Sequence, residues 1–75
     1  EAGFVYYSED GKRLDLKFET RDKQLQATIG FNNNRYELKQ ESDSGFSDDN
    51  LKLKLDRDRA TLSGALTFSG TLFKP

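Results

Sequence analysis

The sequence contains no cysteine and no histidine among its 75 residues. Without cysteine the fold has no disulfide to strengthen it, and without either residue it lacks the usual ligands of a structural zinc site. A domain of this length buries only about 60% of the surface of its unfolded chain, so its hydrophobic core is thin. A sheet that closes into a barrel or sandwich would cover that core and leave few free edges.

The absence of histidine also removes the usual base of a serine or cysteine nucleophile. Acidic residues are plentiful, but nearly all of them fall in expected turns or at outward strand positions, where solvent keeps the pKa of a carboxyl group ordinary. No glycine-rich phosphate loop precedes a helical segment. We therefore expect no enzymatic activity and no cofactor, and we expect the chain to act by binding.

Neither charge sign is in large excess, since 12 basic residues face 13 acidic ones. Nucleic-acid binding requires a basic stripe that displaces counterions from phosphates, and the sequence shows none. No apolar run approaches the roughly 18 residues that span a bilayer. The first residue is not methionine, which indicates either a mature protein whose signal peptide has been removed or a domain cut from a longer chain. A lipid anchor in a precursor is compatible with the first alternative.

The strongest pattern that is present is alternation, because apolar residues recur at every second position. This period is typical of strands with one dry and one wet face, and no stretch has the three-to-four spacing of a helix. The alternating sets are Phe4 and Tyr6; Leu14, Leu16 and Phe18; Leu25, Ala27, Ile29 and Phe31; Tyr36 and Leu38; and Leu51, Leu53 and Leu55.

Short turn signals separate these sets. The signals are Asp10-Gly11, which is typical of a type I′ hairpin, Arg21-Asp22-Lys23, Asn32-Asn33-Asn34 and Arg57-Asp58. They predict one all-β domain over residues 1–75, an antiparallel meander of six to eight strands closing into a barrel or flattened barrel. Residues 60–73 allow two interpretations, a single strand kinked at its glycines or two strands that turn at Ser63-Gly64.

One long polar loop is expected, from Glu41 to Asn50. Its aromatic residue, Phe46, either anchors the loop to the core or forms a contact for a partner. The loop is also acidic, and its residues Asp43, Asp48, Asp49 and Asn50 suggest calcium as an alternative. Their spacing does not match an EF-hand, so we favour a solvated loop with Asx turns and expect no metal site.

The residues in and around this loop resemble the sequence of a known family. Tyr36-Glu37-Leu38-Lys39-Gln40 precedes Ser44-Gly45-Phe46-Ser47-Asp48, and Ala60-Thr61-Leu62 follows a charged turn. This order is similar to that of the bacterial inhibitors of C-type lysozyme, a membrane-bound and periplasmic family of small antiparallel β-barrels. The chain differs from the family in having no cysteine pair and in having Leu-Lys-Leu-Lys-Leu in place of the family's aromatic strand.

The resemblance implies a protein partner, C-type lysozyme, whose two catalytic carboxylates are engaged by a serine loop and a later basic residue. Ser44 corresponds to the family serine, and Arg57 is the nearest cation to the family's basic position, where the register from Ala60 places Asp56. The implied contact residues are Ser44, Gly45, Phe46, Ser47, Asp48 and Arg57. The implied location is periplasmic, outer-membrane-anchored or secreted.

Two other hypotheses remain open. An envelope-associated or adhesin-like interaction module would keep the barrel without inhibiting lysozyme. Its polar contact surface would be formed by the outward Lys52 and Lys54 and by the acidic loop, and the alternating strand Leu51–Leu55 could also pair with a partner strand at its edge. A barrel that holds a ligand inside is less favoured, because side chains alone fill the interior of a barrel of this size.

Overall fold

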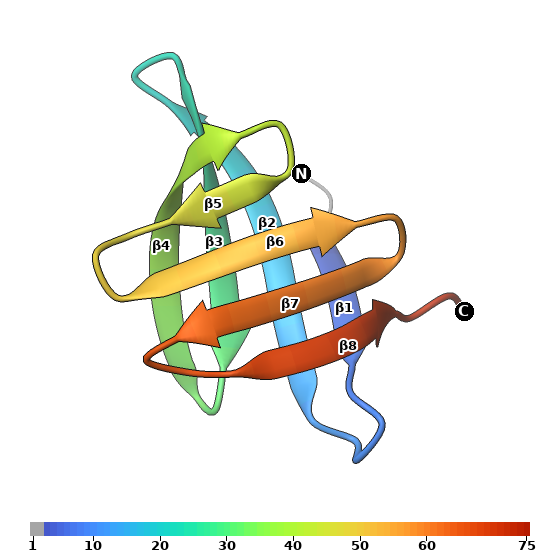
Figure 1. Cartoon of the computed structure of the whole chain (residues 1–75). Helices are drawn as coiled ribbons and strands as arrows, with labels where there is room; N and C mark the ends of the chain where they lie inside the picture. Colours follow the sequence, from blue (N-terminus) through green and yellow to red (C-terminus); the bar gives the residue numbers. More distant parts are fainter. Residues whose placement is uncertain (1–2) are drawn as a thin grey trace.

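The computed structural model describes residues 3–75, and its secondary structure over this range consists of antiparallel strands and turns (Figure 1). The strands are β1 (Gly3–Tyr7), β2 (Arg13–Arg21), β3 (Gln24–Phe31), β4 (Asn34–Ser42), β5 (Gly45–Ser47), β6 (Leu51–Asp56), β7 (Arg59–Gly64) and β8 (Phe68–Leu72). Each strand pairs with the next along the chain, and β8 returns to β1. The prediction of an all-β meander that closes into a barrel is confirmed.

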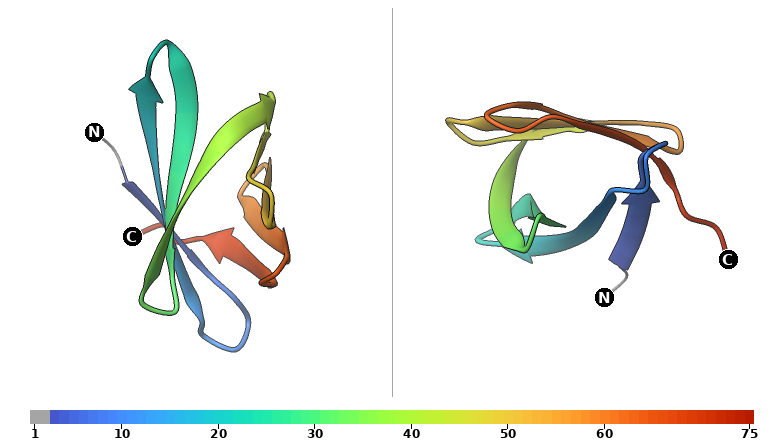
Figure 2. Two further views of the ribbon diagram at one scale, coloured as in Figure 1. Left: turned by 90° about the vertical axis from the view of Figure 1, so that its left-hand side faces the viewer. Right: turned by 90° about the horizontal axis from the view of Figure 1, so that it is seen from below.

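The barrel is flattened into two layers that cross (Figure 2). Strands β1–β4 form a strongly twisted layer, and β5–β8 form a flatter layer that lies across it. The β2–β3 hairpin extends beyond the end of the barrel (Figure 1). The sheet is nevertheless continuous, because β4 pairs with β5 on one side and β8 pairs with β1 on the other.

Most of the predicted alternating residues face the interior, although Phe18, Leu25, Tyr36 and Leu55 are only partly buried, and Phe4 is exposed, contrary to its predicted inward position. Within residues 3–75 the buried hydrophobic side chains are Tyr6, Leu14, Leu16, Ala27, Ile29, Phe31, Leu38, Phe46, Leu51, Leu53, Ala60, Leu62 and Phe68. Over the same range no polar or charged residue is buried. Successive side chains on a strand point to opposite faces. Every second residue of each strand therefore faces the core, and the residues between them face the solvent.

Two of the predicted turns have the expected geometry. Asp22 and Lys23 both have positive φ, as do Asn32 and Asn33, and in each pair the two residues alone connect the flanking strands. This is the geometry of a two-residue type I′ hairpin, whose twist matches that of the strands it joins. A two-residue turn at Arg57-Asp58 also connects β6 to β7.

The prediction of a type I′ turn at Asp10-Gly11 is wrong. Only Gly11 has positive φ, and its N–H donates to the carbonyl of Ser8 at 3.0 Å. The connection is a five-residue loop, Ser8–Lys12, because the Ser8 hydroxyl accepts a hydrogen bond from the backbone N–H of Lys12 at 2.9 Å and stabilises the wider turn.

Residues 60–73 form two strands, as the second interpretation expected, but Ser63 and Gly64 end β7 and the turn lies just after them. The chain turns at Ala65–Thr67, directly after Gly64, which has a φ of +105°. The register places Leu62 opposite Phe68. Glycine is required here for two reasons: the backbone has a positive φ, and a Cβ atom on Gly64 would clash with the carbonyl oxygen of Asn50.

We predict that Gly64→Ala destabilises the barrel by about 2–4 kcal/mol, because the new methyl group meets a backbone oxygen and the backbone conformation disfavours any side chain. Gly30→Ala is the matched control, since a Cβ atom there finds only ordinary contacts with Asp15. Urea unfolding followed by circular dichroism measures both variants. Equal stability of the two variants would contradict this role of Gly64.

The prediction of one long loop from Glu41 to Asn50 is wrong. β4 continues through Ser42, and Gly45–Ser47 form β5, which pairs with β4 and with β6. Only two short connections remain, Asp43–Ser44 and Asp48–Asn50. The segment is a strand because it fills the gap between β4 and β6, which would otherwise each expose an unpaired edge.

Candidate functional site

Phe46 lies in the core, which confirms that it anchors the chain to the core and excludes it as a surface contact. Its side chain is 2% exposed, and its ring packs against that of Phe18 with a centroid separation of 5.4 Å. Gly45 is buried as well, and a Cβ atom on it would lie 2.6 Å from the Ser42 hydroxyl. These two residues of the predicted contact set therefore position their neighbours and do not face a partner.

We predict that Phe46→Ala costs about 3–5 kcal/mol of stability, the usual cost of removing a buried phenylalanine ring. The control is Phe73→Ala, because Phe73 is 55% exposed and its loss is expected to cost less than about 1 kcal/mol. Thermal and urea unfolding measure both values. A Phe46 variant as stable as the Phe73 variant would show that the ring does not support the core.

Ser44 and Arg57 lie at the same end of the barrel. The carbonyl of Ser44 accepts a hydrogen bond from the N–H of Leu55 at 2.9 Å, and Arg57 follows two residues later in the β6–β7 turn. Figure 1 shows the β4–β5 and β6–β7 connections at the same side of the molecule. Ser44 is half-buried and Arg57 is exposed.

Lys54 is a further cation at this end, and it was not among the contact residues that the resemblance implied. It lies directly opposite Gly45 in the β5–β6 register and is exposed. The sequence indicates only that Lys54 is one of the outward lysines of an alternating strand. The pairing of β6 with β5 places it opposite Gly45 and therefore next to the connection that carries Ser44. We call Ser44, Lys54 and Arg57 the hydroxyl–cation rim.

Ser47 lies at the other end of β5 and is bound within the molecule. Its hydroxyl donates a hydrogen bond to Glu41 Oε1, and Lys52 Nζ lies 3.4 Å from Glu41 Oε2. The hydrogen bond from Ser47, followed by the positive charges of Lys52 and Lys54, lowers the pKa of Glu41. Ser47 is therefore a partner of Glu41 and is less available to another protein than Ser44.

We predict that Ser47→Ala raises the pKa of Glu41 towards its ordinary value, because the hydrogen bond that favours the carboxylate is lost. Lys52→Gln should raise it as well, since both the charge and the hydrogen bond of Lys52 favour the carboxylate. NMR titration of the Glu41 side-chain carboxyl carbon measures both. Ser63→Ala is the control, and a shift there as large as that in Ser47→Ala would contradict the assignment.

Asp48 forms the Asx turn expected for the solvated interpretation. Its Oδ1 accepts hydrogen bonds from the N–H groups of Asn50 and Leu51, both at 2.7 Å. These bonds begin β6 and occupy the carboxylate. Within residues 3–75 no group of three or more acidic, histidine or cysteine side chains is placed to hold a metal ion.

The predicted contact residues therefore divide. Ser44 and Arg57 lie in connections at the same end of the barrel, Gly45 and Phe46 are buried, and Ser47 and Asp48 are hydrogen-bonded at the opposite end of β5. Comparisons of the chain with protein-family models, curated proteins and solved structures found no match. No helix in the described range is long and apolar enough to cross a membrane. Support for a function therefore comes from the rim itself.

Proposed function

We propose that the protein binds a C-type lysozyme or a similar glycoside hydrolase and blocks its catalytic cleft with the hydroxyl–cation rim. One observation carries this proposal: the backbone positions of Ser44, Lys54 and Arg57, from two neighbouring connections and one strand, lie at the same end of the barrel. The resemblance to the lysozyme inhibitors, which rests on the Ser44–Asp48 segment, points to the same end.

The chemistry of the target explains why this combination inhibits. A glycoside hydrolase works with two carboxyl groups, of which one must be protonated to act as the general acid. A cation held close to that group favours its ionised form, which has no proton to donate to the leaving group. A hydroxyl group can at the same time donate a hydrogen bond to the second carboxylate.

The barrel holds the rim in place before the target arrives. The hydrogen bond from Leu55 to Ser44 and the pairing of Gly45 with Lys54 fix the backbone of both connections. A rigid binding segment loses little conformational entropy on association, and this favours affinity. The buried Phe46 contributes indirectly, because it ties β5 to the core beneath the rim.

A second candidate function is an interaction module that adds a partner strand to its sheet. The edge suggested for this purpose, Leu51–Leu55, does not serve, because β6 pairs with β5 and with β7. β4 offers a better edge: Asn34–Leu38 pairs with β3 alone, since the pairing of β4 with β5 begins at Lys39. An extended peptide could align there by backbone hydrogen bonds.

The first proposal implies a protein outside the cytoplasm, in the periplasm, anchored to the outer membrane or secreted, because C-type lysozyme attacks the cell wall from outside. It also implies a protein partner and no catalytic activity of its own. A precursor with a lipid anchor would fit the same location.

A lytic assay tests the proposal. We expect a molar excess of the protein to slow the clearing of a cell-wall suspension by C-type lysozyme. The variant Ser44→Ala/Lys54→Gln/Arg57→Gln should need at least about tenfold more protein for the same effect, as expected when contacts at the centre of an interface are lost.

The matched control is Ser63→Ala/Lys23→Gln/Arg21→Gln, which removes the same chemical groups from exposed positions elsewhere. It should inhibit as well as the unmodified protein. Undiminished lysis at large excess of the unmodified protein would overturn the proposal, and equal inhibition by both triple variants would show that the rim is not the contact.

A further inference from the structure

The first half of β4 has a neighbouring strand on one side only. Asn34–Leu38 pairs with β3, and the pairing of β4 with β5 begins at Lys39. The left view of Figure 2 shows this half of β4 diverging from the β5–β8 layer. The edge of Asn34–Leu38 is therefore open to another strand.

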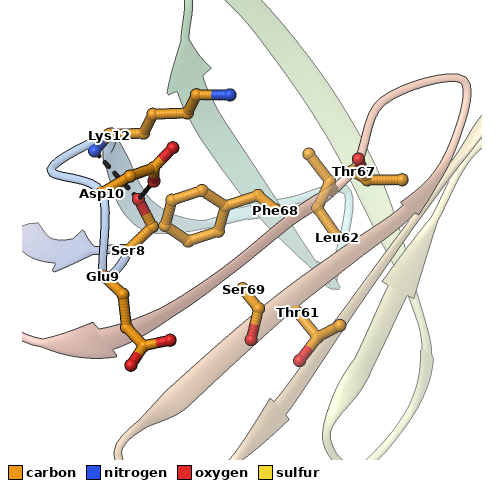
Figure 3. A pocket seen from close by; sticks show the side chains of 9 residues that line it. All are labelled: Ser8, Glu9, Asp10, Lys12, Thr61, Leu62, Thr67, Phe68 and Ser69. Carbon is orange, nitrogen blue, oxygen red and sulfur yellow. Dashed lines mark hydrogen bonds between the residues drawn. The ribbon is translucent and has the colours of Figure 1, made fainter.

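The edge of β8 differs, because a loop stands beside it. β8 pairs with β1 only over its last two residues, so Phe68–Gly70 has no partner strand on that side. The Ser8–Lys12 loop stands there, and loop and strand together line a hollow of about 580 Å³ (Figure 3). The Ser8 hydroxyl holds the loop in shape, since it donates to Asp10 Oδ1 and accepts from the N–H of Lys12. A strand that approached β8 from this side would meet the loop first.

The backbone groups on the open side of β4 belong to Arg35 and Glu37. In a two-residue hairpin the residues that flank the turn, here Phe31 and Asn34, form a hydrogen-bonded pair, and such pairs alternate along the ladder. Every second residue from Asn34 onward therefore bonds to β3, and the N–H and C=O groups of Arg35 and Glu37 point away from it. In the described part of the chain, no turn or side chain forms a hydrogen bond to these groups.

The same two residues carry opposite charges on the outer face of the sheet. Arg35 Nη2 lies 3.3 Å from Glu37 Oε2, and both side chains are exposed. An edge with charges of one sign repels a second copy of itself in every register. An edge whose charges alternate in sign repels a second copy only where like charges lie opposite each other.

Two copies of this edge fit together in one register. Antiparallel pairing about a two-fold axis through Tyr36 places Arg35 of each copy directly opposite Glu37 of the other. Both of these are hydrogen-bonded pairs, so the open N–H and C=O groups of both strands acquire partners. An axis through Arg35 or through Glu37 would instead place like charges opposite each other, which destabilises the pair.

We infer that the protein forms a two-fold symmetric dimer through β4, so that the strand accepted by the open edge of the second candidate function is a second copy of this chain. The length of the edge fits this partner. Asn34 of the second copy, where its turn begins, lies opposite Leu38, the last residue before the pairing with β5. No residue of the hydroxyl–cation rim lies on this edge, so the dimer and the inhibition can be tested separately.

Sedimentation equilibrium of the full chain tests the inference. We expect the weight-average mass to rise from that of one chain towards that of two between about 0.02 and about 2 mM protein, with a Kd below about 1 mM, as is typical of a small interface. The dimer should weaken at high salt, because salt screens exposed ion pairs. A chain that stays monomeric at the highest concentration would overturn the inference.

Arg35→Glu and Glu37→Arg should each weaken the dimer at least about tenfold, because like charges then lie opposite each other. The double swap Arg35→Glu/Glu37→Arg should restore it, since every opposite pair is formed again. Arg13→Glu is the matched control: it breaks a similar ion pair, with Asp15, and changes the net charge equally, but it lies on β2. Equal weakening by Arg13→Glu, or no recovery in the double swap, would contradict the proposed register.

Hydrogen exchange measured by NMR at low and high protein concentration locates the contact. The amides of Arg35 and Glu37 should exchange at least about fivefold more slowly in the dimer, because they gain acceptors there. The amide of Tyr36 already bonds to β3 and should change less. A dimer that leaves the exchange of Arg35 and Glu37 unchanged would show that the two copies do not pair through β4.

Discussion

Closure of the backbone hydrogen-bond ladder is the constraint on which the rest of this structure depends. The ladder is completed by only two residue pairs between β1 and β8, Tyr6 with Leu72 and Tyr7 with Thr71, supplemented by a hydrogen bond from the N–H of Phe73 to the carbonyl of Val5 at 2.7 Å. A 75-residue chain without disulfides has only a small hydrophobic core to stabilise it. Closing the sheet covers its edges and gives one parity of side chains a common interior.

A filled interior confines binding to the ends of the barrel and its outer surface. The rim is of this kind, and the connection that carries Ser44 is fixed by a hydrogen bond from a neighbouring strand. This bond joins the N–H of Leu55 in β6 to the carbonyl of Ser44. Rigidity at these positions follows from the closed ladder, since a sheet with open edges would leave the same connections free to move.

The sequence predicted the fold well, because alternation is a local signal. The set Leu51, Leu53 and Leu55 marks β6 without any knowledge of its neighbours. β5 could not be found in this way, since it has three residues and only one of them, Phe46, is a large apolar residue. A period cannot be measured from one residue, and the polar flanks of this segment are typical of loops. Pairing with β4 and β6 decides its structure.

The candidate site was predicted only in part, because local patterns do not contain the pairing between strands. Ser44 and Arg57 were identified through a resemblance in sequence, and alternation alone marks Lys54 as an outward cation. The placement of Lys54 next to the Ser44 connection depends on the β5–β6 register, which no local pattern contains.

Chemical-shift mapping of the ¹⁵N-labelled protein with unlabelled C-type lysozyme tests most directly whether this end of the barrel is the binding surface. If the hydroxyl–cation rim is the binding surface, the largest chemical-shift changes fall on the amides of Ser44, Lys54 and Arg57, and the amides of the Ser8–Lys12 loop do not change. An unchanged spectrum at saturating lysozyme, or changes centred away from the rim, would contradict it.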